Sequence, residues 1–234
     1  MQTQGTKEIY SALDKVWPDN NIWYSYLHNT IIDFVQSNLK NLLSSESVYL
    51  NAGSGGSTYN LHGTCYHVDI AANLIADLPH SYVASVEALP FENAFFDTII
   101  CVGSVLNYCS ALESISEFAR TLKKGGFLVL EFERSQSAEL WFSKDFCKYA
   151  TLQQYSYLGD MHNLWLYSES YIIKLLKEAN FNIINKKRIH SLSAIINKFT
   201  QNENYAGQFG HYDKFFSAFS YLSAHNTIML CEKM

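Results

Sequence analysis

The chain has 234 residues, of which 48% are apolar, and this is enough to bury the core of one domain with modest additions. Its 17 basic and 22 acidic residues give a net charge of -5, so no global positive field draws it to nucleic acid or to an anionic membrane. The same apolar content excludes a disordered chain, and no apolar stretch approaches the roughly 18 to 20 residues that a membrane span needs.

The five cysteines and eight histidines indicate a reducing compartment and no metal site. The cysteines are odd in number, form no CxxC pair and mostly lie inside apolar runs, so we expect reduced, buried thiols. No signal-peptide pattern opens the chain, and the predicted location is the cytoplasm. The histidines are scattered, without HxH or HExxH spacing, so no metal is predicted.

Residues 1–44 are expected to form an N-terminal helical cap. Apolar residues recur at helical spacing between Ile22 and Leu43, and Pro18 interrupts the pattern, which predicts two helices.

Residues 45–134 alternate short apolar runs with helical stretches. The predicted strands are SVYLNA, CYHVDI, SYVAS, DTIICVG and GFLVLEFE, with helices near 71–75 and 112–122. Strands that are apolar nearly throughout and separated by helices predict a parallel sheet covered on both faces. This is the doubly wound α/β class, whose ligands bind at the carboxyl ends of the strands.

The rest of the chain predicts an aromatic loop over 135–167, a helix over 168–179 and a strand in FNIINKKRIHSL. A polar, aromatic and partly helical stretch over 193–225 then precedes a last strand, NTIMLCEK. No repeat and no domain boundary is visible, so residues 1–234 are expected to form one domain.

The stretch VYLNAGSGGSTY ends the first predicted strand in a glycine turn. A dinucleotide-binding turn needs G-x-G-x-x-G, but the third position is Thr58. The stretch fits better a turn in which an acidic or amide residue ends the strand and G-x-G-x-G follows, with no phosphate to hold. Gly53 and Gly55 would then let the backbone pass close under a ligand, because they carry no Cβ.

The motifs that follow strengthen this interpretation. Asp69 closes the next strand, and ASVEALPFENAFFDTIICVGSVLNY and LKKGGFLVLEFER come later. From Val48 to Glu133, and more loosely through 168–184, the chain resembles a class I S-adenosylmethionine-dependent methyltransferase of the type 11-like group. The resemblance implies a Rossmann-like, doubly wound, seven-stranded sheet, mostly parallel with an antiparallel last strand, plus N-terminal helices.

The resemblance also implies a site for S-adenosylmethionine (AdoMet), which leaves as S-adenosylhomocysteine (AdoHcy). Asp69 would accept hydrogen bonds from both ribose hydroxyls, Ile70 would pack on the adenine, and Val86 would meet that ring through its backbone. The predicted cofactor-binding residues are Tyr24, Asn51, Gly53, Ser54, Gly55, Asp69, Ile70, Ser85, Val86, Glu87, Gly103, Ser104 and Val105.

Three positions depart from the family pattern. Asn51 replaces the usual acid at the end of the first strand, Ser57 replaces the third glycine, and Ser85 replaces the acid near the adenine amine. Asn51 and Ser85 still offer oxygens that accept hydrogen bonds. If Asn51 faces the cationic end of the cofactor, Asn51→Asp is expected to retain or strengthen cofactor binding.

Methyl transfer needs a general base only when the acceptor must lose a proton, because alignment and exclusion of water supply much of the rate. The candidate catalytic residues are His162, His211 and Tyr108. The alternatives are a surface or structural role for His162 and a helix start, with Asn107 as its cap, around Tyr108. His190 is a further candidate base, and His67 is expected in the core.

Aromatic residues at three places admit two interpretations each. Tyr24 or Tyr26 would touch the ligand through a cation–π contact, or would dock the helix on the domain together with Tyr10 and Trp23. The segments 135–167 and 193–225 would form a lid over an apolar or aromatic acceptor, or a homodimer interface.

The predicted function is methyl transfer from AdoMet to a small molecule. A methyltransferase for protein or nucleic acid is disfavoured by the acidic charge balance and by the lack of an N/D-PPY/F motif. The remaining alternatives are an AdoMet-binding protein without catalysis and a nucleotide-binding oxidoreductase, which would need a glycine at Thr58.

Overall fold

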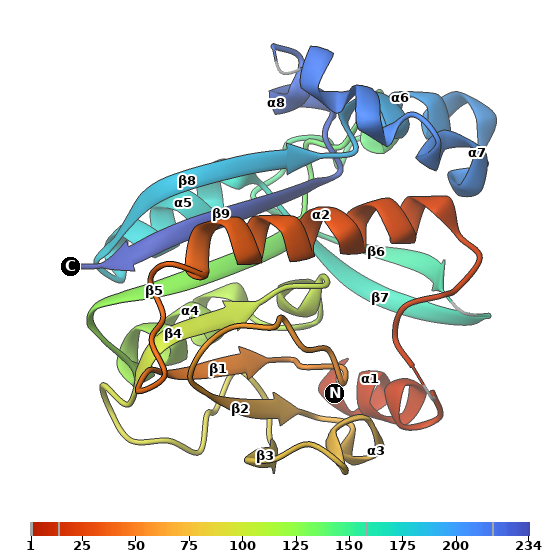
Figure 1. Cartoon of the computed structure of the whole chain (residues 1–234). Coiled ribbons are helices and arrows are strands. Elements are labelled where there is room, and N and C mark those ends of the chain that lie inside the picture. Colours follow the sequence, from red (N-terminus) through yellow and green to blue (C-terminus); the bar gives the residue numbers. More distant parts are fainter. Residues whose placement is uncertain (1, 14, 158, 217) are drawn as a thin grey trace.

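A computed structural model of the chain describes residues 2–13, 15–157, 159–216 and 218–234. Its centre is a seven-stranded sheet in the spatial order β3-β2-β1-β4-β5-β9-β8 (Figure 1). Of these strands only β9 runs antiparallel to its neighbours, so the predicted Rossmann-like sheet with an antiparallel last strand is confirmed. The strands are β1 Val48–Ala52, β2 Thr64–Asp69, β3 Ser81–Val83, β4 Phe96–Cys101, β5 Leu122–Glu133, β8 Phe181–Ile189 and β9 Asn226–Lys233.

Helices cover both faces of this sheet. Tyr49 and Ile100 pack with α2 on one face, and Leu50 and Ile99 pack with α4 and α5 on the other. Successive side chains of a strand point to opposite faces, so burial on both explains strands that are apolar nearly throughout. Figure 1 shows α2 in front of the sheet and α4 and α5 behind it. The helices named here and below are α1 Gln2–Ser11, α2 Ile22–Leu39, α3 Ala72–Ile75, α4 Ala111–Thr121 and α5 Glu169–Glu178.

The three longest of these helices that pack on the sheet begin at side-chain caps. Asn21 accepts hydrogen bonds from the backbone N–H groups of Trp23 and Tyr24 at the start of α2. Ser110 and Ser168 cap α4 and α5 in the same way. An N-cap satisfies donors that have no partner within the helix, which fixes where each helix starts.

The expectation of a loop over 135–167 is wrong for its second half. Ala150–Tyr157 (β6) and Asp160–Tyr167 (β7) pair as an antiparallel hairpin outside the main sheet. A short 3-10 helix, η2 (Ala138–Leu140), precedes them. The strands carry polar residues among the aromatic ones and bury only part of their surface, so the apolar pattern of a core strand is missing.

Residues 191–223 form a helical layer beyond the start of β9, seen at the top of Figure 1. Its elements are α6 Ser191–Thr200, α7 Glu203–Gly207, η3 Gly210–Phe215 and α8 Ser220–Ser223. The carboxylate of Asp213 accepts hydrogen bonds from the backbone N–H groups of His190, Ser191 and Leu192, at 2.6, 2.9 and 3.1 Å. Asp213 therefore ties η3 to the first turn of α6.

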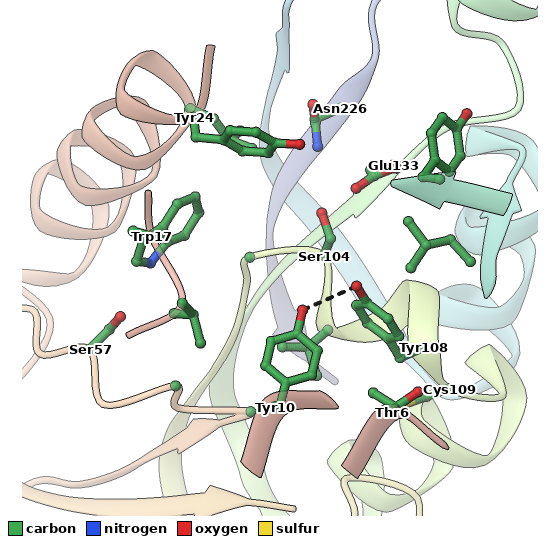
Figure 2. A pocket seen from close by; sticks show the side chains of 18 of the residues that line it. Thr6, Tyr10, Trp17, Tyr24, Ser57, Ser104, Tyr108, Cys109, Glu133 and Asn226 are labelled. Atoms are coloured by element: carbon green, nitrogen blue, oxygen red, sulfur yellow. Dashed lines mark hydrogen bonds between the residues drawn. The ribbon is translucent and has the colours of Figure 1, made fainter. Parts of the chain in front are cut away.

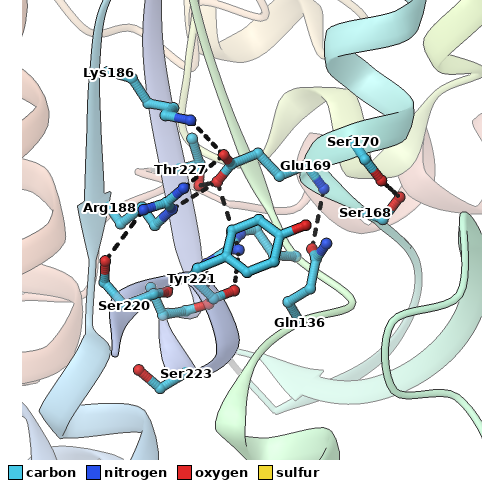
Figure 3. A network of polar contacts seen from close by, with 12 residues as sticks. Gln136, Ser168, Glu169, Ser170, Lys186, Arg188, Ser220, Tyr221, Ser223 and Thr227 are labelled. Carbon is cyan, nitrogen blue, oxygen red and sulfur yellow. Dashed lines mark hydrogen bonds and ion pairs between the residues drawn. The ribbon is translucent and has the colours of Figure 1, made fainter. Parts of the chain in front are cut away.

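A buried ion network joins this layer to the sheet (Figure 3). The guanidinium of Arg134, which has no exposed surface, donates to the carbonyl oxygens of Ser220, Tyr221 and Ala224. The carboxylate of Glu169 lies 3.5 Å from Arg134 and accepts two hydrogen bonds from Arg188, each 2.8 Å long. Burial lowers the pKa of Arg134 to about 10, so the group stays charged at neutral pH.

Within the described part of the chain, each helix is too short or too polar to cross a membrane.

Candidate active site

A cavity opens at the carboxyl ends of β1, β2, β4 and β5, where the family resemblance implies the cofactor. Of the predicted cofactor-binding residues, its lining contains Tyr24, Gly53, Ser54, Gly55, Asp69, Ile70, Ser85, Val86, Gly103, Ser104 and Val105. The remaining two, Asn51 and Glu87, lie outside the lining.

The turn after β1 passes close to the segment after β4. Gly53 has a φ of 72°, and a Cβ on it would lie 2.4 Å from a methyl group of Val105. Gly55 has a φ of 51°, and a Cβ on it would lie 2.9 Å from Val16. Both the backbone conformation and the lack of space require glycine at these two positions.

Asp69 ends β2 and lies 8% exposed at the cavity wall. Its two carboxylate oxygens accept hydrogen bonds from the backbone N–H groups of Gly55, at 2.7 Å, and Ala71, at 2.9 Å. Burial raises the pKa of Asp69, and these hydrogen bonds act in the opposite direction. A carboxylate has about four acceptor sites, so these bonds leave capacity for two further donors.

The floor of the cavity is held from below by Glu131. This buried side chain of β5 accepts hydrogen bonds from the backbone N–H groups of Gly103, at 2.9 Å, and Ser104, at 2.7 Å. Its other oxygen accepts from the amide of Asn226 at 2.7 Å. Burial raises the pKa of Glu131 to about 7. Glu131 therefore fixes the turn after β4 without lining the cavity itself.

The N-terminal helices and the segment between them contribute aromatic residues to several sides of the cavity. Tyr10 of α1, Trp17 of the connecting segment and Tyr24 of α2 all line the cavity. Trp17 stacks on His28 at 4.5 Å between ring centroids, and its ring lies over Gly103. In Figure 2, Trp17 and Ser57 border one side, Tyr10 and Tyr108 lie below, and Tyr24 and Asn226 lie above.

Asn51 and Glu87 support the site from behind. The amide nitrogen of Asn51 donates to the carbonyl oxygen of Ser57 at 2.8 Å and to the hydroxyl of Ser54 at 3.2 Å. Glu87 accepts from the backbone N–H of Ser110 at 2.7 Å. Both side chains hold loops that border the cavity.

The donor role of Asn51 reverses the expected effect of Asn51→Asp. The substitution would place a carboxylate oxygen against the carbonyl oxygen of Ser57, where an N–H group now lies. We expect Asn51→Asp to weaken ligand binding and lower stability by about 1–3 kcal/mol, the cost of losing such a donor in a buried place. Thermal denaturation and calorimetric titration with AdoMet would measure both effects. Asn60→Asp adds the same charge at an exposed position of the loop that follows β1 and should change neither value.

Two of the three candidate catalytic residues lie together. The hydroxyl of Tyr108 forms a hydrogen bond of 2.9 Å with Nδ1 of His162 and accepts one of 3.1 Å from Tyr10. Tyr10 and Tyr108 line the cavity, and His162 lies behind them on β7, 2% exposed. Burial raises the pKa of Tyr10 to about 12. The third candidate, His211, is exposed in η3 and contacts the ring of Tyr212 at a tilt of 40°, outside the cavity lining.

The other residues weighed as catalytic have structural partners. Asn107 donates to the carbonyl oxygens of Glu133 and Trp165 and accepts from the backbone N–H of Glu133, so it clamps β5 to β7. His67 is buried against the hydroxyl of Ser54. His190 is buried, stacks on Trp23 at 3.8 Å, and burial lowers its pKa well below the usual value.

The sequence did not point to a group of polar residues that lines the far side of the cavity. Glu133, Glu139, Glu203 and His225 come from β5, η2, α7 and the residue before β9. Glu139, Glu203 and His225 belong to no motif, and Glu133 stands near the end of LKKGGFLVLEFER. Glu133 had one available signal, since it ends the fifth strand, where this fold places ligand contacts. Within the described residues, no three or more His, Cys, Asp or Glu side chains are arranged so that they could hold a metal ion.

Residues 49–130 match a family model described as a methyltransferase domain. This is less than half of the chain, and no curated protein sequence matches it.

Solved structures share the fold at low sequence identity. The chain resembles a 1,6-didemethyltoxoflavin-N1-methyltransferase from Burkholderia thailandensis, with 14% identity, a TM-score of 0.59, and coverage of 99% of this chain and 87% of that one. It also resembles a geranyl diphosphate C-methyltransferase from Streptomyces coelicolor, with 10% identity, a TM-score of 0.64, and coverage of 100% and 98%. A third, the cyclase SpnF, has 16% identity, a TM-score of 0.63 and coverage of 99% and 96%.

Proposed function

We propose that this chain, which carries a methyltransferase domain over residues 49–130 on a Rossmann-like methyltransferase fold, transfers a methyl group from AdoMet to a small molecule.

The arrangement around Asp69 carries the proposal. A partly satisfied carboxylate at the end of β2 faces the cavity, and the glycine turn after β1 leaves no room for side chains beside it. Two adjacent hydroxyls of a ribose fit such an acceptor, and the apolar side chains of Ile70 and Val86 offer a surface for the base. The residues present therefore fit AdoMet.

Positioning and exclusion of water would be the main work of the protein. When bound, AdoMet supplies a methyl group on a positively charged sulfur. Tyr10, Trp17 and Tyr24 would cover the ligand and keep water from the reacting atoms, and their ring faces favour a cation beneath them. Gly103 and Ser104, held by Glu131, would set the floor on which donor and acceptor align.

Tyr108 and His162 are the groups best placed to take a proton from an acceptor that must lose one. The Tyr108 hydroxyl lines the cavity, so it can accept a proton from the acceptor while its own proton passes to Nδ1 of His162 behind it, where it would stay as an imidazolium. We expect Tyr108→Phe and His162→Gln each to slow methyl transfer about tenfold, while AdoMet affinity stays the same. His211→Gln is the matched control and should have no effect, because His211 lies outside the cavity lining. Unchanged rates in all three variants would remove the relay from the mechanism.

The test uses AdoMet with a labelled methyl group and a cell extract separated by size. The label should pass to the small-molecule fraction. Label found only in protein or nucleic acid would favour a methyltransferase that acts on those macromolecules. AdoMet binding by calorimetry without any transfer would leave a protein that binds but does not catalyse. Affinity for NAD in place of AdoMet would favour the oxidoreductase.

The chemistry of the lining narrows the acceptor. The cavity contains no lysine or arginine among the described lining residues, so a diphosphate such as the one named for the Streptomyces coelicolor protein is not supported. The cyclase SpnF shares this fold, so the fold alone does not specify methyl transfer. A cytoplasmic location, supported by five free cysteines, and a homodimer remain part of the proposal.

A further inference from the structure

The far side of the cavity has an unusual concentration of carboxylates. Glu133, Glu139 and Glu203 all line it, together with a single histidine, His225. These residues come from the end of β5 and from segments outside the central sheet, so they lie where acceptor specificity would be decided if the central sheet holds the cofactor.

The positive charges that face these carboxylates do not balance them. The imidazole of His225 lies 2.9 Å from Glu139 and 3.3 Å from Glu133. Although burial opposes it, these two carboxylates raise the pKa of His225 well above its usual value, so the ring is an imidazolium. Lys198 donates to the backbone carbonyl oxygen of Glu139 from outside the cavity. Three carboxylates against these two cations leave one negative charge.

Glu203 is the carboxylate with the least compensation. Burial raises its pKa, and the negative charges of Glu139 and Glu133 raise it further, while His225 and a hydrogen bond with Tyr24 act in the opposite direction. A cation placed beside Glu203 would offset that cost, because an opposite charge within a few ångströms favours the ionised carboxylate.

Asn226 places a hydrogen-bond acceptor that lacks a donor on the same wall of the cavity. The residue lines the cavity and is fully buried, and its amide nitrogen is used by Glu131. Within the described residues its Oδ1 has no hydrogen-bond partner. Figure 2 shows Asn226 beside Tyr24 and Glu133 on the upper side of the cavity. A buried acceptor in such a position is suited to an N–H donor of a ligand.

Aromatic rings line the cavity together with the carboxylates, His225 and Asn226. Trp23, Tyr24 and Tyr155 line the same cavity, and the ring of Trp23 stands edge-on to His225 at 5.4 Å between centroids. Ring faces and carboxylates together are the usual surroundings of a bound organic ammonium group.

We propose that this compartment, formed by Glu133, Glu139, Glu203, His225, Asn226 and Tyr24, binds an organic cation, so that the acceptor of the methyl group carries an amine or ammonium group. That the bound cation is the methyl acceptor rests on the proposed function. The binding of the cation stands on the compartment itself.

The test compares four ligands that share a benzyl or phenyl ring and differ in charge. Calorimetry would measure benzylamine, benzyltrimethylammonium, benzyl alcohol and benzoate on protein saturated with AdoHcy and on protein without it. We expect the two cations to bind at least about tenfold more tightly than the alcohol and the benzoate, a difference of about 1.4 kcal/mol. Equal binding of the alcohol or the benzoate, or no binding of either cation, would overturn the proposal.

Two variants test whether the preference for cations comes from this compartment. Glu203→Gln keeps the shape of the side chain and removes its charge, so it should abolish most of the tenfold preference. Glu92→Gln removes one charge at an exposed position and should keep the preference. AdoHcy affinity should stay within about twofold in both. A large loss of AdoHcy affinity in Glu203→Gln would assign the compartment to the cofactor ammonium group instead.

The same measurements separate this inference from the proposed function. Preference for cations without any affinity for AdoMet or AdoHcy would keep the cation site and refute the methyltransferase. Binding of AdoMet or AdoHcy without a preference for cations would refute the cation site and leave the proposed methyltransferase standing.

Discussion

Glu169→Gln is expected to lower the free energy of unfolding by about 3 kcal/mol, the range for removing one partner of a buried ion pair. The substitution keeps the size of the side chain but leaves Arg134, which has no exposed surface, without its counter-charge. Arg188 and Lys186 lose the same partner. Because Arg134 also holds the carbonyl oxygens of Ser220, Tyr221 and Ala224, we expect the helical layer over the sheet to loosen first.

The loss of stability caused by Glu169→Gln depends on pH. Although burial opposes it, hydrogen bonds from Arg188 and Lys186 lower the pKa of Glu169 from 4.5 to about 2. A lowered carboxyl pKa stabilises the fold above the unfolded value and loses that contribution as the pH falls through the folded value. The difference in stability between the native protein and Glu169→Gln should therefore be constant above about pH 5 and shrink towards about pH 2.

Urea denaturation at several pH values would measure this difference. Glu178→Gln is the control, because Glu178 lies on the same helix, is exposed and pairs loosely with Lys174 at 3.8 Å. Its cost should stay within about 0.5 kcal/mol. A cost for Glu169→Gln as small as that of the control would show that the network contributes nothing to stability.

Asp69→Ala is expected to weaken AdoMet binding by about 2 kcal/mol or more, which is about a 30-fold rise in the dissociation constant. The carboxylate would lose its bonds to the ribose hydroxyls, and the backbone N–H groups of Gly55 and Ala71 would lose their acceptor. Both effects act on the same turn, so the loss of affinity should exceed that of any single lining residue.

Calorimetry with AdoMet and AdoHcy measures this loss, and thermal denaturation shows whether the variant is folded. Asp77→Ala removes an exposed carboxylate from the segment after α3 and should leave both affinities unchanged. Neither variant should bind NAD. Micromolar affinity for NAD, or full AdoMet affinity in a folded Asp69→Ala protein, would contradict the role proposed for Asp69.

The sequence predicted best what depends on a few neighbouring residues. The glycine turn requires positive φ angles at Gly53 and Gly55, and this requirement is written into the residue types themselves. Asp69 could be placed because it ends a strand, and parallel strands bring their carboxyl ends to one edge of a sheet. Gly53, Gly55 and Asp69 all line the cavity, as does Tyr108.

Predictions that depended on side-chain direction were less secure. Asn51 stands where the family has an acid, but its side chain turns back to hold Ser57 rather than facing the cavity. His162 and His211 are alike in sequence, each in an aromatic stretch, yet one is buried behind Tyr108 and the other is exposed. No local pattern distinguishes them, because their surroundings come from other segments.

The sequence by itself determined the alternation of strands and helices, the covering of both faces of the sheet and the turn that borders the cavity, because periodicity and glycine act over short distances along the chain. Only the tertiary structure brought Glu133, Glu139, Glu203 and His225 to one wall. These residues lie up to 92 positions apart in the sequence, from Glu133 to His225, on segments that share no motif. Their combined charge, and with it the cation inferred for this compartment, exists only after the hairpin and the helical layer have packed around the ends of the strands.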